Sequence, residues 1–147
     1  MAVIVEINAK TKAAKVKSAP TAQGVLIPAD EIAAYRTLVQ SLMERYCPAS
    51  RQEKFLVQSL ADIEWRLSRI PSLEAGIYHA GHREMADLHS EQHDPAIRAA
   101  LIEAEIFMKY QREFSDLSLQ EARLLRLRRK TLAGLREAIP TSSNRRP

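Results

Sequence analysis

Cysteine is almost absent from this sequence, with Cys47 as its single instance in 147 residues. One cysteine excludes a disulfide within the chain, and the surrounding "RYCPAS" lacks the CxxC or zinc-ligand spacing that would give the thiol another use. Glycine is also scarce, with 4 residues, and aromatic residues make up only 5%. Sheet proteins with tight turns use both, so we expect an all-α fold in a protein of the reducing cytoplasm.

Long apolar runs and catalytic motifs are missing as well. The apolar run in the opening "MAVIVEINAK" is only four or five residues long and is broken by an acid, so we expect neither a signal peptide nor a membrane span. The sequence holds no glycine-rich phosphate loop and no recognisable pairing of a nucleophile with a base. We therefore expect a non-enzymatic protein without cofactors and without a membrane partner.

Positive charge is concentrated at the two ends of the chain. Residues 1–20 have a net charge of +3, residues 121–147 of +6, and residues 21–120 of −5, within a total of +4. The basic residues of the first segment are Lys10, Lys12, Lys15 and Lys17. A nucleic acid or another anionic surface would meet these ends, although the acidic middle offers them an intramolecular or intersubunit partner.

Changes in composition divide the chain into three parts. Residues 1–24 form a basic arm of mostly small side chains, interrupted by Pro20 and Gly24, with the β-branched content of a short strand at its start. Residues 25–139 show helical periodicity and are expected to form a single α-helical domain. Residues 140–147 form a polar, basic tail that we expect to be disordered.

Local signals predict where the helices begin and end. A first helix is expected at 29–46, between Pro28 and Pro48. A second begins after Ser50, whose spacing to Glu53 is that of a capping box. Its apolar residues fall in an arc of about 80°, as in a coiled-coil seam. These residues are Leu56, Leu60, Ile63, Leu67 and Ile70. Pro71 is then expected to kink or end this helix.

A last long helix is expected from Ala96 to about Ala138, with Asp94 as its N-cap and Pro95 at its first position. Residues 115–118 are the place where it would break. Two helical segments, 50–88 and 95–138, are thus joined by a short polar stretch. We predict that they form a long antiparallel, coiled-coil-like hairpin, and that the first helix packs across it.

The stretch "ARLLRLRRKTLAGLR", residues 122–136, contains six basic side chains and five leucines. On a helical wheel the leucines share one arc, about 160° wide, and are expected to pack. The opposite side carries Arg123, Arg126, Arg129, Lys130 and Arg136. This basic face is interpreted as a nucleic-acid-binding surface, as a solvated face that balances the acidic middle, or as a membrane-surface helix, which the lack of aromatic anchors disfavours.

Two charges fall inside apolar arcs. Arg128 lies within the leucine arc, and Glu64 lies at the edge of the seam of the second helix. Because a buried charge needs a partner, we predict a structural ion pair between them that sets the register of the hairpin. In the alternative interpretation, Arg128 extends to water.

Four histidines lie close together in the sequence, at His79, His82, His89 and His93. Their spacing suits ligands on one helical face, but no ExxH pair and no nearby cysteine supports a metal, so we expect exposed histidines and no metal site. Trp65 lies beside Arg66 and is interpreted either as part of a base-stacking patch or, as we favour, as a packed residue at the edge of the seam.

The segments Val25–Pro28 ("VLIP"), Pro48 and Glu64–Leu67 ("EWRL") resemble a group of small bacterial helical proteins. That group shares a basic N-terminal arm, a "VLP" start to its first helix, a proline after this helix and an "EWRL" element. The resemblance covers residues 21–135. It implies a helical architecture and carries over no function.

The clustered cations favour a non-enzymatic nucleic-acid-binding protein that contacts the backbone of DNA or RNA. Such a protein would be a homo-oligomer or a small subunit of a larger nucleoprotein complex. The alternative is a coiled-coil scaffold, without a nucleic-acid role, that self-associates through the Leu56–Ile70 seam.

Overall fold

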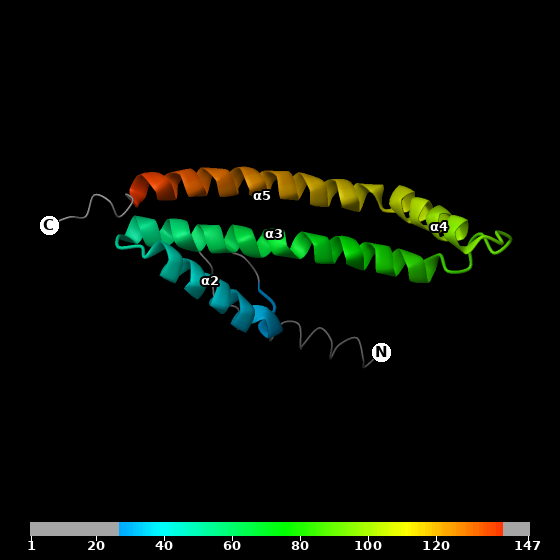
Figure 1. Cartoon of the computed structure of the whole chain (residues 1–147), viewed down its shortest axis with the longest axis horizontal. Helices are drawn as coiled ribbons and strands as arrows, with labels where there is room; N and C mark the ends of the chain where they lie inside the picture. The colour runs from blue at the N-terminus through cyan, green and yellow to red at the C-terminus, as the bar shows by residue number, and fades with distance from the viewer. Residues whose placement is uncertain (1–26, 140–147) are drawn as a thin grey trace, which may run out of the picture. The chain divides into compact units, whose positions relative to one another are not determined.

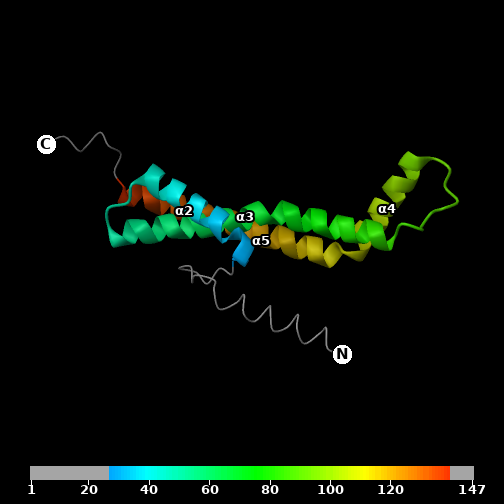
Figure 2. The same cartoon turned by 90° about the horizontal axis from the view of Figure 1, so that it is seen from below.

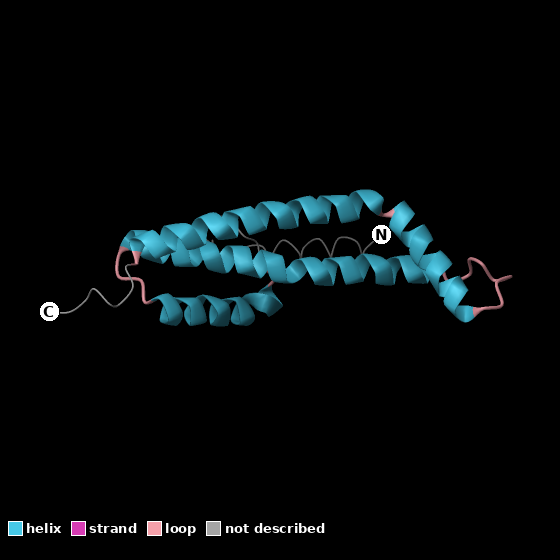
Figure 3. Cartoon of the chain, turned by 45° about the horizontal axis from the view of Figure 1, so that its top comes forward, coloured by secondary structure: helices cyan, strands magenta, loops and turns pink. Residues whose placement is uncertain are grey.

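The structure is a computed structural model that describes residues 27–139 (Figure 1). Over this range the chain is all-α and contains no strand (Figure 3). The elements are η1 (Ala29–Glu31), α2 (Ile32–Tyr46), α3 (Arg51–Glu84), α4 (Pro95–Lys109) and α5 (Gln111–Ala138). The expected basic arm with its short strand, the expected tail, and the residues Lys10, Lys12, Lys15 and Lys17 lie outside the described residues.

The first predicted helix is confirmed, as η1 followed by α2. The chain leaves the helix at Cys47, which adopts a left-handed conformation with φ of 43° and donates its backbone N–H to the carbonyl of Met43. A residue in this conformation satisfies one of the last carbonyls of a helix and turns the chain away. Pro48 follows and cannot continue the helix.

The capping residues predicted for the second helix lie at the start of α3. The hydroxyl oxygen of Ser50 accepts the N–H of Glu53 at 3.1 Å, and the Glu53 carboxylate accepts the N–H of Ala49 at 2.7 Å. Both bonds occupy backbone donors that lack helical partners at this end. Pro71, in contrast, does not end the helix, because it lies inside α3.

The loop of residues 85–94 joins α3 to α4 (Figure 2). Asp94 caps α4 as predicted, since its carboxylate accepts the N–H of Ala96 at 2.9 Å and that of Ile97 at 3.3 Å. Pro95 occupies the first helical position, where a missing N–H costs nothing.

The predicted helix from 96 to 138 is broken, but at Tyr110 and not at residues 115–118, because α4 ends at Lys109 and α5 runs from Gln111 to Ala138. Tyr110 separates them, with φ of −101° and ψ of 19°. The side chains of both Lys109 and Tyr110 hydrogen-bond Glu84 of α3. A contact with a distant helix therefore coincides with this bend, and neither glycine nor proline marks it in the sequence.

The chain divides into two compact units, and both α3 and α5 contribute residues to each. Of the described residues, the first unit comprises 27–65 and 127–139. In it Glu64 of α3 contacts Arg128 of α5, whereas Leu56 lies next to Gly134. The contacts therefore progress in opposite directions along the two helices, so these segments are antiparallel. The buried core of this unit consists of Leu42, Val57, Leu60, Ala61 and Leu135.

The second unit comprises Arg66–Arg126 and is also built from antiparallel segments. The rings of Tyr78 in α3 and Phe114 in α5 lie 4.9 Å apart. Glu84 follows Tyr78 along α3, and it contacts Lys109, which precedes Phe114 in the chain. The antiparallel packing predicted from the sequence is thus confirmed within each unit. The buried core here consists of Met85, Ile102 and Ile106, against which Tyr78 and Tyr110 pack.

α3 and α4 come into close contact at Gly81. A Cβ atom at this position would lie 2.7 Å from Cγ1 and 2.8 Å from Cγ2 of Ile106, well inside van der Waals distance. Gly76, one and a half turns earlier, has nothing within 4 Å of the corresponding position. Gly81 therefore makes room for Ile106, which sequence periodicity did not reveal.

Three of the five residues in the apolar seam of α3 are buried, the other two, Leu56 and Leu67, are partly buried, and the buried surface is wider than predicted. Leu60, Ile63 and Ile70 are at most 2% exposed. Residues outside the predicted arc are buried to the same degree, with Val57 and Asp62 both at 0%. In the first unit α3 is contacted by α2 as well as by α5, which explains the extra burial. The seam is therefore occupied by partners from the same chain.

Candidate nucleic-acid interface

The basic face of α5 consists of the five cations Arg123, Arg126, Arg129, Lys130 and Arg136, and all five are exposed. Within residues 27–139, no hydrogen bond or ion pair joins any of them to another side chain. Arg123 and Arg126 belong to the second unit, and Arg129, Lys130 and Arg136 belong to the first. All five lie on α5 (Figure 1).

Only part of the leucine arc of α5 packs as expected. Leu124 and Leu135 are 3% and 2% exposed, whereas Leu125 and Leu127 are 43% and 45% exposed. The expectation that all five leucines pack is therefore wrong for two of them. Both lie about 80° from the middle of the arc, where a helix that meets the core along one stripe turns toward solvent.

Arg128 and Glu64, the two charges expected to pair, are brought together in the first unit. The guanidinium Nε of Arg128 donates a hydrogen bond to Oε1 of Glu64 at 2.5 Å. This bond, reinforced by the Glu64 charge, raises the pKa of Arg128 above its ordinary value. The side chains remain 42% and 30% exposed, so the pair is partly solvated and its attraction is screened.

The four histidines do not come together as a ligand set. Residues 27–139 contain no group of three or more His, Cys, Asp or Glu side chains placed to hold a metal ion. His79, His82 and His93 are exposed, as expected. His89 is half-buried instead, with its ring nitrogens 3.9 Å from Glu91 and 3.8 Å from Glu105.

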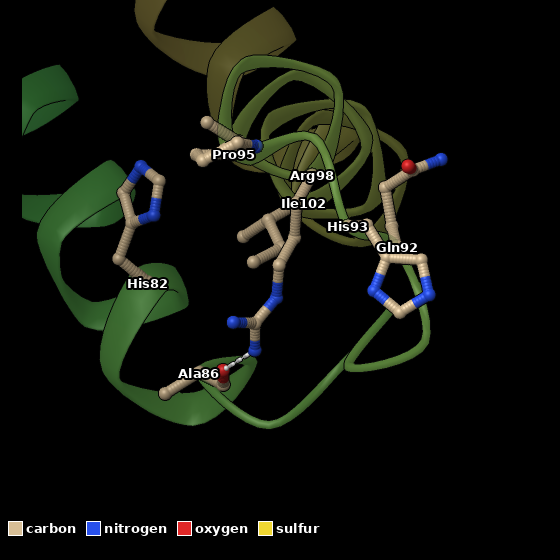
Figure 4. A pocket seen from close by; sticks show the side chains of 8 residues that line it. His82, Ala86, Gln92, His93, Pro95, Arg98 and Ile102 are labelled. Carbon is tan, nitrogen blue, oxygen red and sulfur yellow. Dashed lines mark hydrogen bonds between the residues drawn. The ribbon is translucent and has the colours of Figure 1, made fainter.

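His82 and His93 line a pocket of about 400 Å³ in the second unit, where Figure 4 shows them on either side of Arg98. The guanidinium of Arg98 donates to the carbonyl of Ala86 at 2.7 Å and to that of Leu88 at 3.1 Å. Arg98 thus ties α4 to the residues that follow α3. Its hydrogen bonds stabilise the loop, and the residues that line the pocket include no nucleophile paired with a base.

A buried polar cluster in the first unit was not predicted. Tyr35 of α2 donates its hydroxyl hydrogen to the carboxyl group of Asp62, which is 0% exposed. The Gln58 amide donates to the Tyr35 hydroxyl oxygen at 2.6 Å and to Asp62 at 3.2 Å. Burial raises the pKa of Tyr35, and the hydrogen bond and charge of Asp62 raise it further. The one feature of the sequence that could have indicated this cluster is the position of Tyr35 inside the apolar stripe of α2, where its hydroxyl group needs a polar partner.

Trp65 packs against this cluster, because its ring meets that of Tyr35 edge to face at 5.6 Å. Its neighbours in this small core include Ile27 and Ile32. The contact supports the packing interpretation of Trp65 that was favoured from the sequence.

A surface cluster connects α3 to the bend between α4 and α5. The Glu84 carboxylate accepts hydrogen bonds from Lys109 and, at 2.8 Å, from the Tyr110 hydroxyl. The bond from Lys109, followed by that from Tyr110, lowers the pKa of Glu84, and the same bonds raise the pKa values of Lys109 and Tyr110. Glu84 and Lys109 are exposed and Tyr110 is partly buried, so the cluster links two helices near the surface.

No protein-family model, no curated protein and no solved structure matches this chain. The resemblance to small bacterial helical proteins thus stays a prediction. Within residues 27–139, no helix combines the length and the apolar character needed to cross a membrane.

Proposed function

We propose that this protein is a non-enzymatic, cytoplasmic nucleic-acid-binding protein that contacts phosphate groups through the basic face of α5. The observation that carries the proposal is that all five cations of this face are exposed and that no acidic side chain within residues 27–139 pairs with them. A face that balanced the acidic middle of the chain would engage carboxylates. Unengaged cations along one helix suit release of counterions from a phosphate backbone.

The chemistry of α5 favours contact with the backbone over reading of bases. Its one aromatic residue, Phe114, is 9% exposed, so the helix offers bases no ring on which to stack. Arginine and lysine contacts to phosphate fix the position of a protein without reading sequence. We therefore expect similar affinity for different sequences. The lysines of residues 1–24 and the two arginines of residues 140–147 add to the positive charge available for phosphate contacts.

A coiled-coil scaffold remains the alternative function. A scaffold that self-associates through the Leu56–Ile70 seam requires the side chains of this seam to be accessible to a second chain. Leu60 and Ile70 are each 2% exposed within a single chain, which favours the nucleic-acid proposal over a scaffold built on this seam.

The test is a salt-titrated binding assay with duplex DNA, single-stranded DNA and structured RNA. Arg126, Arg129 and Lys130 are replaced together by glutamine. Each lost phosphate contact flattens the plot of log affinity against log salt by about 0.7 to 0.9, so the triple variant should lose about 2 to 3 units of slope. Helical content should not change, because all three side chains are exposed.

A matched control replaces Arg36, Lys54 and Arg83 by glutamine. These three side chains are also exposed and lie on α2 and α3. Their replacement removes three positive charges, as the triple variant of α5 does. The control should retain nearly the slope of the original protein. Absence of binding at about 0.1 M salt, or an equal loss of slope in both variants, would show that the basic face of α5 makes no specific contribution.

A further inference from the structure

α4 has two apolar faces, and among residues 27–139 only one of them packs against the rest of the protein. Ile102 and Ile106 are 8% and 0% exposed and form the core of the second unit. On the other side of the helix, Ile97 is 49% exposed, Leu101 38% and Met108 61%. A surface helix normally turns charged or polar residues outward, so this second face is unusual for a helix with no further partner.

The exposed residues follow the spacing of a coiled-coil seam. With Ala104, which is also exposed, they are separated by four, three and four residues along α4. On a helical wheel they fall about 200° to 260° from Ile102, almost opposite the packed face. The small side chain of Ala104 allows another helix to approach closely at this point. We name Ile97, Leu101, Ala104 and Met108 the outer seam of α4.

The charges beside the outer seam indicate what can cover it. On a helical wheel Arg98 and Glu105 lie about 40° to 60° beyond one edge of the outer seam, on the same side and with opposite charges. The guanidinium of Arg98 also donates to the carbonyls of Ala86 and Leu88, which holds this side chain in place. In antiparallel orientation each Arg98 faces the other helix's Glu105, so this edge is complementary to a second copy of itself.

We propose that the outer seam of α4 is an interface with a second copy of this chain, in which the two α4 helices pair antiparallel about a twofold axis. In this arrangement the four-three-four spacing sets Leu101 opposite the partner's Ala104 and Ile97 opposite the partner's Met108. A large residue then meets a small one at the centre. At the edge, Arg98 lies near the partner's Glu105, a pair of opposite charge that the twofold axis forms twice.

The length of α4 sets the strength of this association. Fifteen residues give about two heptads, fewer than the three or four that sustain a stable coiled coil. The dimer should therefore be weak and reversible. It differs from the Leu56–Ile70 seam, which is largely buried in each chain, and it does not depend on the proposed nucleic-acid function.

The test is sedimentation equilibrium of the full chain from about 1 µM to about 1 mM, the range in which a weak interface is populated. We expect a reversible monomer–dimer equilibrium. Leu101→Glu and Met108→Glu should each weaken it at least about tenfold, because each places a charge inside the apolar contact, at its centre and at its end respectively. The matched control is Leu119→Glu on α5, a leucine that is 56% exposed and lies off the seam.

Circular dichroism of each variant should match that of the original chain, because the replaced side chains are exposed. A monomer over the whole concentration range would overturn the proposal. So would Leu119→Glu weakening the dimer as much as Leu101→Glu does, since the contact would then not be specific to the outer seam.

Disulfide cross-linking tests the orientation. In a Cys47→Ser background, one chain carries Leu101→Cys and another carries Ala104→Cys. The antiparallel pairing predicts that the mixture forms a covalent heterodimer faster than either chain forms a homodimer. Faster homodimer formation by each chain alone would indicate parallel helices and would overturn the arrangement.

Discussion

Replacing Gly81 and Gly76 by alanine should have opposite effects on stability, although both residues lie in α3. Alanine is favoured over glycine inside a helix by about 1 kcal/mol, and this gain is available at both positions. At Gly76 nothing lies within 4 Å of the new methyl group. Gly76→Ala should therefore stabilise the protein by about 0.5 to 1 kcal/mol.

At Gly81 the same methyl group would overlap Ile106, whose Cγ1 atom lies 2.7 Å from the Cβ position. Ile106 is 0% exposed, so its side chain is confined and cannot move aside freely. Overpacking of this kind costs about 1 to 3 kcal/mol. After the gain in helix propensity, Gly81→Ala should destabilise the protein by up to about 2 kcal/mol, and the two variants should differ by about 1 to 3 kcal/mol.

Urea unfolding followed by circular dichroism measures both free energies, with the slope of each transition compared to verify that the unfolded states are alike. Ile106→Ala supplies a further check, because it removes the atoms that the new methyl group would meet. The cost of Gly81→Ala should fall in that background. If Gly81→Ala stabilises the protein as Gly76→Ala does, the inferred contact between α3 and α4 is wrong.

Two further predictions concern the first unit. Tyr35→Phe should cost about 1 to 3 kcal/mol, because it removes a donor to the buried Asp62, whereas Tyr46→Phe, in the same helix, should change stability by less than about 0.5 kcal/mol. Burial raises the pKa of Tyr35 above its ordinary 10.0, so its contribution is complete below pH 10 and is lost as the pH rises further. The free energy of unfolding should therefore be lower in Tyr35→Phe than in Tyr46→Phe below pH 10, and this difference should narrow as the pH rises further. Urea unfolding at several pH values measures the difference, and a difference that does not change with pH would contradict this role. For Glu64 and Arg128, a double-mutant cycle should give a coupling energy of about 0.2 to 1 kcal/mol, given their partial exposure, and a value near zero would show that the pair contributes nothing.

The positions of most helix ends were predictable because the responsible interactions are local. Ser50 with Glu53, and Asp94 with Pro95, act on backbone groups within a few residues, so the sequence alone displays both partners. The contact between Glu64 and Arg128 was predictable for a related reason. A charge inside an apolar arc has few choices of partner once two helices are expected to face each other.

Features created by contacts between distant residues were not predictable. The bend at Tyr110 accompanies hydrogen bonds to Glu84, which lies 26 residues earlier in the chain. The partnership of Tyr35 with Asp62 likewise depends on how α2 lies against α3. The exposure of the five cations on α5 was predicted from the helical wheel, but the exposure of Leu125 was not, since a helical wheel does not show how wide a stripe the neighbouring helix covers.

The left-handed turn at Cys47 places an exposed thiol at the end of α2, where a fluorescent label can be attached to measure a distance within the first unit. The thiol is exposed and is the only one in the chain, and Trp65 is the only tryptophan. An energy-transfer acceptor attached to Cys47 therefore reports one distance, from the junction of α2 and α3 to the place where Tyr35 meets Trp65. Transfer measured while nucleic acid is added would reveal whether α2 stays docked, with no residue of the chain replaced.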